Sequence, residues 1–143
     1  MQRCLIIDDS PVIRRVARNI VAELGYVVQE AEHGRQAFEL CCIDMPSLIL
    51  LDWQLPVMGP YEFLKALRSF GPREWPYIVY CTTEFDFIDI QRARAAGASD
   101  TLMKPFDRGT LTAKLERVSY LAAARATGDE PRRATLRKQL QPN

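Results

Sequence analysis

Acidic, hydroxyl and amino side chains stand at the ends of separate apolar runs in this sequence. Asp8 and Asp9 follow the first run, Asp52 ends the third, Thr82 ends the fourth and Lys104 ends the fifth. Carboxylates that are brought close together repel one another unless a cation compensates their charge. Mg²⁺ prefers oxygen ligands and usually binds one or two carboxylates together with phosphate oxygens. These residue types therefore predict a magnesium site beside a phosphoryl group.

The same residues could carry out a phosphoryl transfer. An aspartate can act as the attacking nucleophile, while a divalent cation neutralises charge on the transferring group. Lys104 supplies a compact positive charge for one phosphoryl oxygen, and the hydroxyl of Thr82 could donate a hydrogen bond to another. We therefore predict a covalent aspartyl phosphate on Asp52.

Short apolar runs alternate along the chain with segments of helical spacing, and this alternation predicts the elements that position those side chains. Strands are predicted at residues 4–8, 26–29, 47–52, 77–82 and 101–104. Helices are predicted at residues 11–24, 35–42, 61–69, 87–96 and from 107 onward. Ser10 and Pro11 have the types expected at the start of the first helix, and Gly25 is typical of its end.

Five strand–helix pairs in sequence predict an α/β fold, with an open parallel sheet covered by helices on both faces. Ligands of such sheets bind outside the carboxyl ends of the strands. The strand-end side chains are therefore expected to converge on one cleft.

The order of these motifs resembles the receiver domains of two-component response regulators, in particular the single-domain, CheY-like proteins. The matching segments are residues 7–10 (IDDS), 50–58 (LLDWQLPVM), 81–83 (CTT) and 97–106 (GASDTLMKPF). The resemblance covers about residues 3–122, and the order and spacing of the segments are more specific than any one of them. It implies a flavodoxin-like, doubly wound sheet of five parallel strands in the order 2-1-3-4-5, with five helices.

The resemblance also implies a role for each candidate site residue. Asp52 is expected to be the phosphoacceptor, and Thr82 and Lys104 are expected to bind phosphoryl oxygens. The expected Mg²⁺ ligands are Asp8, Asp9, Asp52 and the backbone carbonyl of Gln54. The bond between Lys104 and Pro105 is expected to be cis, as in such proteins.

The resemblance implies partners of two kinds. A sensor histidine kinase or a histidine phosphotransfer protein would donate the phosphoryl group, and a downstream target protein or a further relay step would receive the signal. The chain would not be an enzyme, apart from the phosphorylation and dephosphorylation of its own Asp52. The output surface implied by the family comprises the fourth helix, the fifth strand and the fifth helix.

Two positions depart from the family pattern. Gly59 and Pro60 stand where the family usually has Asp-Gly, which is expected to shift the start of the following helix and to alter a partner surface. Thr101 stands where many members carry a switch aromatic, so that activation would need other residues, with Tyr80 and Phe85 as candidates.

Two other functions are alternatives to this one. A haloacid-dehalogenase-type phosphatase needs a second acid two residues after its nucleophile, but Asp8 is followed there by Ser10 and Asp52 by Gln54. A receiver-fold adaptor that works without phosphorylation, through its helical face or a basic tail, stays open because of the two departures.

Several residues have ordinary interpretations. We expect His33 to be a solvated loop residue, Trp53 to lie near the site and Trp75 to pack locally. The cysteines are expected to be free and buried or half-buried, since their spacing is not that of a zinc site; they are Cys4, Cys41, Cys42 and Cys81.

Length and composition indicate one globular domain. We assign residues 1–124 to the receiver domain and residues 125–143 to a polar, mildly basic tail. The net charge of +1 argues against a dedicated nucleic-acid binder, and no DNA-binding domain is expected after the last helix. The chain has no apolar run of the roughly 18 residues that a membrane span needs, and the run before Asp8 is short for a signal peptide. A cytoplasmic location is therefore expected.

Overall fold

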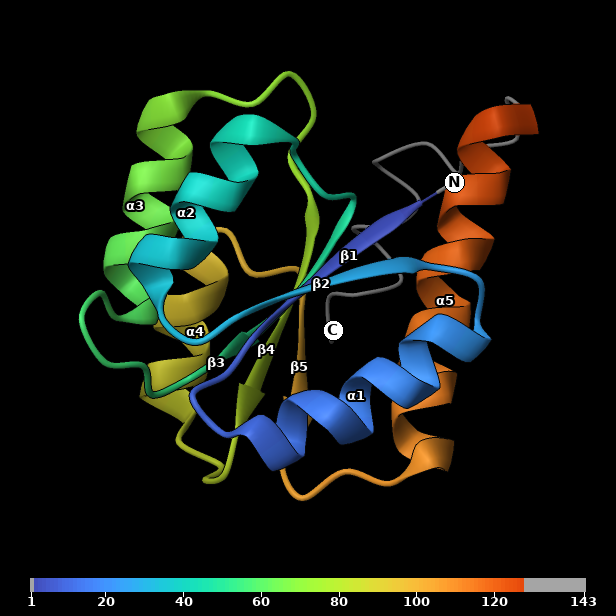
Figure 1. Cartoon of the computed structure of the whole chain (residues 1–143), viewed down its shortest axis with the longest axis horizontal. Coiled ribbons are helices and arrows are strands. Elements are labelled where there is room, and N and C mark those ends of the chain that lie inside the picture. The colour runs from blue at the N-terminus through green and yellow to red at the C-terminus, as the bar shows by residue number, and fades with distance from the viewer. Residues whose placement is uncertain (1, 128–143) are drawn as a thin grey trace, which may run out of the picture.

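A parallel β-sheet with helices on both faces organises the computed structural model, which describes residues 2–127 (Figure 1). The five strands are β1 (Arg3–Ile7), β2 (Val27–Ala31), β3 (Leu48–Asp52), β4 (Tyr77–Thr82) and β5 (Asp100–Met103). The helices are α1 (Pro11–Glu23), α2 (Gly34–Ile43), α3 (Pro60–Phe70), α4 (Phe87–Ala95) and α5 (Arg108–Thr127). The strand order is β2-β1-β3-β4-β5, which confirms the predicted topology.

The central strand, β3, is buried along its whole length. It pairs in parallel with β1 on one side and with β4 on the other, so that Leu51 stands opposite both Ile7 and Tyr80. A strand covered on both faces needs a continuous apolar run. Residues 48–51 (LILL) form such a run. The register brings the carboxyl ends of β1 and β3 side by side, and therefore Asp8 close to Asp52.

Two hydrophobic cores lie on opposite faces of the sheet. α1 and α5 cover one face, where Ala17 and Ile20 of α1 pack with Leu111 and Leu115 of α5. α2, α3 and α4 cover the other face (Figure 1). The sheet is thus closed on both sides, and its strand ends are left accessible.

Side chains cap the helices that lead away from the strand ends. Ser10 accepts a hydrogen bond from the N–H of Ile13 at 3.3 Å, with Pro11 in the first turn, as predicted. After α1, Gly25 has φ 93°, a conformation that glycine adopts at little cost. His33 caps α2 by accepting the N–H of Gln36 at its Nδ1, 3.1 Å away. We expected His33 to be a solvated loop residue, and its capping role was not predicted.

The start of α3 differs from the prediction in a way that matters here. α3 begins at Pro60 rather than at residue 61, because proline fits the first helical position, where its missing N–H is not needed. α5 extends to Thr127, and the domain boundary assigned at residue 124 stays a prediction. The tail predicted at residues 125–143 lies, from residue 128 onward, outside the described residues. No helix in the described part of the chain is long and apolar enough to span a bilayer.

Candidate functional site: an acidic cluster with one lysine

Three carboxylates meet at the carboxyl ends of β1 and β3. Asp8 and Asp52 are each 4% exposed, whereas Asp9 is exposed to solvent. One oxygen from each of the three lies within 4.8 Å of the others. The convergence predicted from the strand ends is therefore present for these acids.

Lys104, which follows β5, joins two of these acids. Its Nζ lies 2.8 Å from Asp8 Oδ2 and 2.7 Å from Asp52 Oδ1, and its side chain is largely buried. The following peptide bond to Pro105 is cis, as the resemblance implied. The lysine compensates part of the negative charge that the fold collects at this edge of the sheet.

Burial raises the pKa of Asp52 to about 6, and the charges of Asp8 and Asp9 add to the effect. The hydrogen bond from Lys104 acts in the opposite direction. For Lys104, hydrogen bonds to Asp52 and Asp8 outweigh burial and raise the pKa. At neutral pH the lysine is therefore charged, and Asp52 is mainly a carboxylate.

The position of Asp8 is fixed by contacts that the sequence did not indicate. Its Oδ1 accepts the N–H of Ser10 at 2.9 Å, and its carbonyl oxygen accepts Arg14 Nη1 at 2.7 Å. Arg14 is held in turn by Glu30 of β2, with Nε 3.1 Å from Oε1. No periodicity connects residues 8, 14 and 30, so only the fold reveals this positioning.

The cluster forms the floor of an open hollow of about 510 Å³. Its lining residues are Asp8, Asp9, Ser10, Asp52, Trp53, Gln54, Leu55, Pro56, Thr83 and Lys104. Trp53 thus lies near the site, as expected. Gln54 lines the same hollow, and the role of its carbonyl as a metal ligand stays a prediction.

Thr82 and Thr83 are placed differently. Thr82 is 2% exposed, and its Oγ1 donates to the carbonyl oxygen of Glu84 at 3.1 Å. Thr83 is exposed and lines the hollow. A role for Thr82 in binding a phosphoryl oxygen therefore needs its hydroxyl to leave Glu84.

The β3–α3 loop borders the hollow and is held by a tight turn. The N–H of Met58 donates to the carbonyl oxygen of Pro56 at 2.7 Å, around Val57 with φ 67°. Such a positive φ is strained for a β-branched residue. The carbonyl oxygen of Met58 accepts the N–H of Gly34 at 3.1 Å, which fastens the loop to the first turn of α2.

The donor set fits a magnesium ion. Carboxylate oxygens are the hard ligands that Mg²⁺ prefers, with ion–oxygen distances of about 2.0–2.1 Å. Oxygens on opposite sides of such an ion stand about 4.2 Å apart, so three oxygens within 4.8 Å need little adjustment to bind one ion. Asp9 faces solvent, so its carboxylate would be accessible to an incoming ion, and its role as a metal ligand stays a prediction.

Comparison with known proteins assigns the family. The family model described as "Response regulator receiver domain" matches residues 4–116, which include all three acids and Lys104. The chain belongs to this family. Receiver domains generally act as signalling modules rather than as enzymes, and the family binds Mg²⁺ at an acidic pocket.

This receiver domain is similar to chemotaxis proteins over nearly their whole length. It is 35% identical to chemotaxis protein CheY1 of Helicobacter pylori over 116 residues, 80% of this chain and 94% of the relative. It is 35% identical to a CheY homolog of Campylobacter jejuni over 118 residues, 81% of this chain and 91% of the relative. The crystal structure of Vibrio cholerae CheY4 matches with a TM-score of 0.77 and 35% identity, and the match covers 82% of this chain and 98% of that one.

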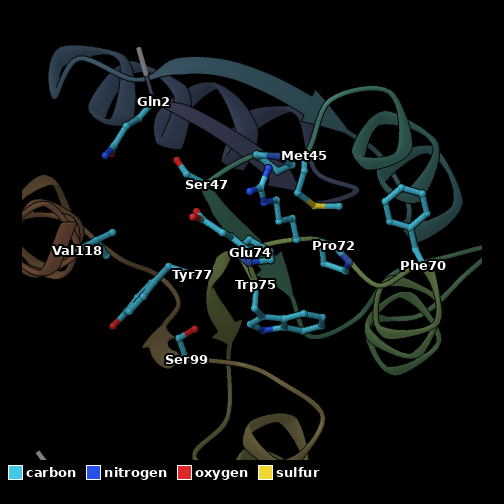
Figure 2. A pocket seen from close by; sticks show the side chains of 13 residues that line it. Gln2, Met45, Ser47, Phe70, Pro72, Glu74, Trp75, Tyr77, Ser99 and Val118 are labelled. Atoms are coloured by element: carbon cyan, nitrogen blue, oxygen red, sulfur yellow. The ribbon is translucent and has the colours of Figure 1, made fainter. Parts of the chain in front are cut away.

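The receiver domain has a second, larger cavity of about 890 Å³ at the opposite pole, where the strands begin (Figure 2). Figure 2 shows Gln2, Ser47, Trp75 and Tyr77 around it. Trp75 packs locally, as expected, since its Nε1 donates to the carbonyl oxygen of Gly97 at 2.8 Å. Because it is separated from the acidic cluster by the length of the sheet, this cavity takes no part in the site.

Proposed function

We propose that this receiver domain accepts a phosphoryl group on Asp52 from a histidine kinase or a histidine phosphotransfer protein, with Mg²⁺ as cofactor. The observation that carries the proposal is the contact of Asp52 with Lys104, 2.7 Å apart, in a hollow that Asp8 and Asp9 also line. A nucleophile, a fixed cation and a pair of metal ligands are thereby supplied by three separate strand ends.

In the proposed transfer, an oxygen of Asp52 forms a bond to phosphorus while the bond from phosphorus to the donor's histidine nitrogen breaks. The pKa of about 6 leaves Asp52 mainly ionised at neutral pH, as a nucleophile must be. Lys104 lies close enough to offset the charge of the phosphoryl oxygens. Asp8, Asp9, Asp52 and the Gln54 carbonyl would hold Mg²⁺, which when bound neutralises further charge on the phosphoryl group.

The output of the phosphorylated protein is proposed to be binding to a target protein or transfer of the phosphoryl group in a relay. Apolar side chains project from the face formed by α4 and β5. Phe87 is 65% exposed, Ile88 is 78% exposed and Met103 is 43% exposed. Phosphorylation would then stabilise one of two arrangements of this face.

Intact-protein mass spectrometry after incubation with Mg²⁺ and acetyl phosphate tests the transfer. We expect one acid-stable, base-labile phosphoryl adduct on the wild-type protein and none on Asp52→Ala. Asp86→Ala is a matched control, because Asp86 is an exposed aspartate that caps α4, and it should still take up the adduct. Absence of an adduct with both acetyl phosphate and phosphorylated kinases would contradict the proposal.

A phosphorylation-independent adaptor is the second candidate, favoured by Thr101, which gives the fifth strand no switch aromatic. Thr101 is half-buried, and its N–H donates to Asp100 Oδ1 at 2.7 Å. An adaptor of this kind would bind its partner equally well as wild-type protein and as Asp52→Ala, whereas a phosphorylation switch would not.

A further inference from the structure

Asp89, in the first turn of α4, accepts hydrogen bonds from two tyrosines that belong to other elements. The hydroxyl of Tyr61, in α3, lies 2.5 Å from Asp89 Oδ1. The hydroxyl of Tyr80, in β4, lies 2.8 Å from Asp89 Oδ2. Hydrogen bonds to an ionised acceptor are roughly twice as strong as those between neutral groups. We call these three residues the tyrosine clasp, which ties α4 to both α3 and β4.

Little else holds α4 to the rest of the molecule. Only Ile90 and Ala93 of this helix are buried, whereas Phe87 and Ile88 are mostly exposed. The guanidinium of Arg92 adds a contact, 4.1 Å from the ring centroid of Tyr61. Elements with few buried apolar contacts open at low free-energy cost. The clasp therefore contributes a large share of the attachment of α4.

Both tyrosine hydroxyls stay protonated, as donors must be. Burial and the hydrogen bond to Asp89 raise the pKa of Tyr61 to about 12. The same two causes raise the pKa of Tyr80, whose side chain is fully buried, well above its ordinary value. The clasp is thus intact throughout the neutral pH range.

The clasp is connected to the phosphorylation site through β4. Tyr80 and Thr82 are two residues apart on this strand and point to the same face of the sheet. Thr82 has a single hydroxyl proton, which it donates to the carbonyl oxygen of Glu84. Donation to a phosphoryl oxygen on Asp52 would therefore release Glu84. The segment released leads directly to Asp86, which caps α4 through the N–H groups of Ile88 and Asp89.

We propose that the tyrosine clasp holds α4 in its unphosphorylated arrangement and is weakened when Thr82 turns to a phosphoryl group on Asp52. The proposal rests on the proposed function. It adds that the tyrosine clasp opposes the rearrangement of α4 on phosphorylation. Thr101 gives the fifth strand no aromatic for this task, whereas the clasp joins α3, β4 and α4 directly. Because coupling is reciprocal, loosening the clasp must tighten binding of a phosphoryl group.

Titration with beryllium fluoride, used as a mimic of a phosphoryl group on Asp52, in the presence of Mg²⁺ tests this coupling. Binding is followed by tryptophan fluorescence, to which Trp53 in the hollow contributes. Tyr61→Phe and Tyr80→Phe each remove one clasp hydroxyl and keep the ring. We expect each to bind beryllium fluoride about fivefold more tightly than the wild type. Affinity for Mg²⁺ alone should not change, since the metal ligands are untouched.

Tyr77→Phe is the matched control, because Tyr77 lies on the same strand and faces the opposite core; its affinity should equal that of the wild type. Amide hydrogen exchange across α4 should be faster in both clasp variants without ligand, and not in Tyr77→Phe. Equal beryllium fluoride affinities in all four proteins would overturn the coupling alone. Wild-type protein that binds Mg²⁺ but no beryllium fluoride would overturn the proposed function, and the coupling with it. Tyr61 is only half-buried, so Tyr61→Phe should fold normally. It therefore still tests the coupling if Tyr80→Phe folds poorly.

Discussion

The Asp52 carboxylate lies where the fold makes its negative charge unfavourable. It is buried at the end of β3, with a second buried acid beside it, and Lys104 provides the compensating hydrogen bond within the protein. A bound cation such as Mg²⁺ would therefore lower the free-energy cost of this negative charge. A phosphoryl group on Asp52 would add further negative charge, so the proposed transfer is expected to need that cation.

The first prediction concerns pH in the absence of metal. The folded-state pKa of Asp52, about 6, is above its ordinary value of 3.8. Its contribution to stability is therefore fully present below about pH 3.8 and is lost as the pH rises through 6. Asp52→Asn keeps the side chain neutral at every pH. We expect the unfolding free energy of Asp52→Asn to exceed that of wild type by an amount that grows with pH. Between pH 4.5 and 7.5 this difference should grow by on the order of 1 kcal/mol, after allowance for solvent screening.

Urea denaturation of both proteins in EDTA, at several pH values across that window, measures the difference. A difference that stays constant with pH would show that Asp52 does not titrate there.

A second prediction concerns Asp9, the exposed member of the cluster. Asp9→Ala should leave the metal-free protein as stable as wild type or slightly more stable, because it removes a repelling charge. Wild-type protein at a Mg²⁺ concentration of about 100 times its Kd should gain about 2.7 kcal/mol, and the variant should gain far less. Thermal unfolding with and without Mg²⁺ measures both effects. Glu116→Ala, an exposed acid on α5, should respond to Mg²⁺ like the wild type.

At the scale of elements, the loop between β3 and α3 is set by its contact with α2. A Cβ atom added to Gly34 would lie 2.3 Å from the carbonyl oxygen of Met58 and 3.0 Å from its carbonyl carbon. These are backbone atoms, so the loop would have to move as a unit. Glycine is required at this position by the close approach of two elements.

We therefore predict that Gly34→Ala destabilises the protein by about 1–3 kcal/mol and lowers its affinity for Mg²⁺, since the displaced loop carries Gln54. Gly109→Ala serves as the control, because its added Cβ would lie at an ordinary 3.4 Å from Asp107 and the helix would gain propensity. Chemical denaturation and Mg²⁺ titration of both variants measure the effects. Equal stabilities would mean that the loop adapts freely.

The elements that were predictable are those with a local signal. The run LILL before Asp52 needs cover on both faces, and Ser10 with Pro11 marks a helix start, so β3 and α1 followed from sequence. The acids were predictable as a site because strand ends of a parallel sheet converge. Contacts such as Arg14 with Asp8, Gly34 with Met58, and Tyr61 with Asp89 were not, since they join distant residues whose spacing carries no period.

At the scale of the whole molecule, stability should decrease from the centre of the sheet to its edges. β3 is paired on both sides and covered on both faces, whereas β2 and β5 are edge strands and α4 has two buried side chains. Amide hydrogen exchange of metal-free protein should therefore be slowest in β1 and β3 and should require global unfolding there. Exchange in β5 and α4 should be faster by local opening. Equal protection of α4 and β3 would contradict this order.

The burial pattern of the thiols has a practical consequence for chemical labelling. Cys4, Cys41 and Cys81 are buried, and burial raises the pKa of each thiol, so that they offer little reactive thiolate. Cys42 alone of the four is exposed, on α2 and away from the acidic hollow. A maleimide dye should therefore attach once to the native chain and at all four positions after unfolding. The natural protein thus carries a single attachment point for a fluorophore on α2, which can be used without engineering the other cysteines away.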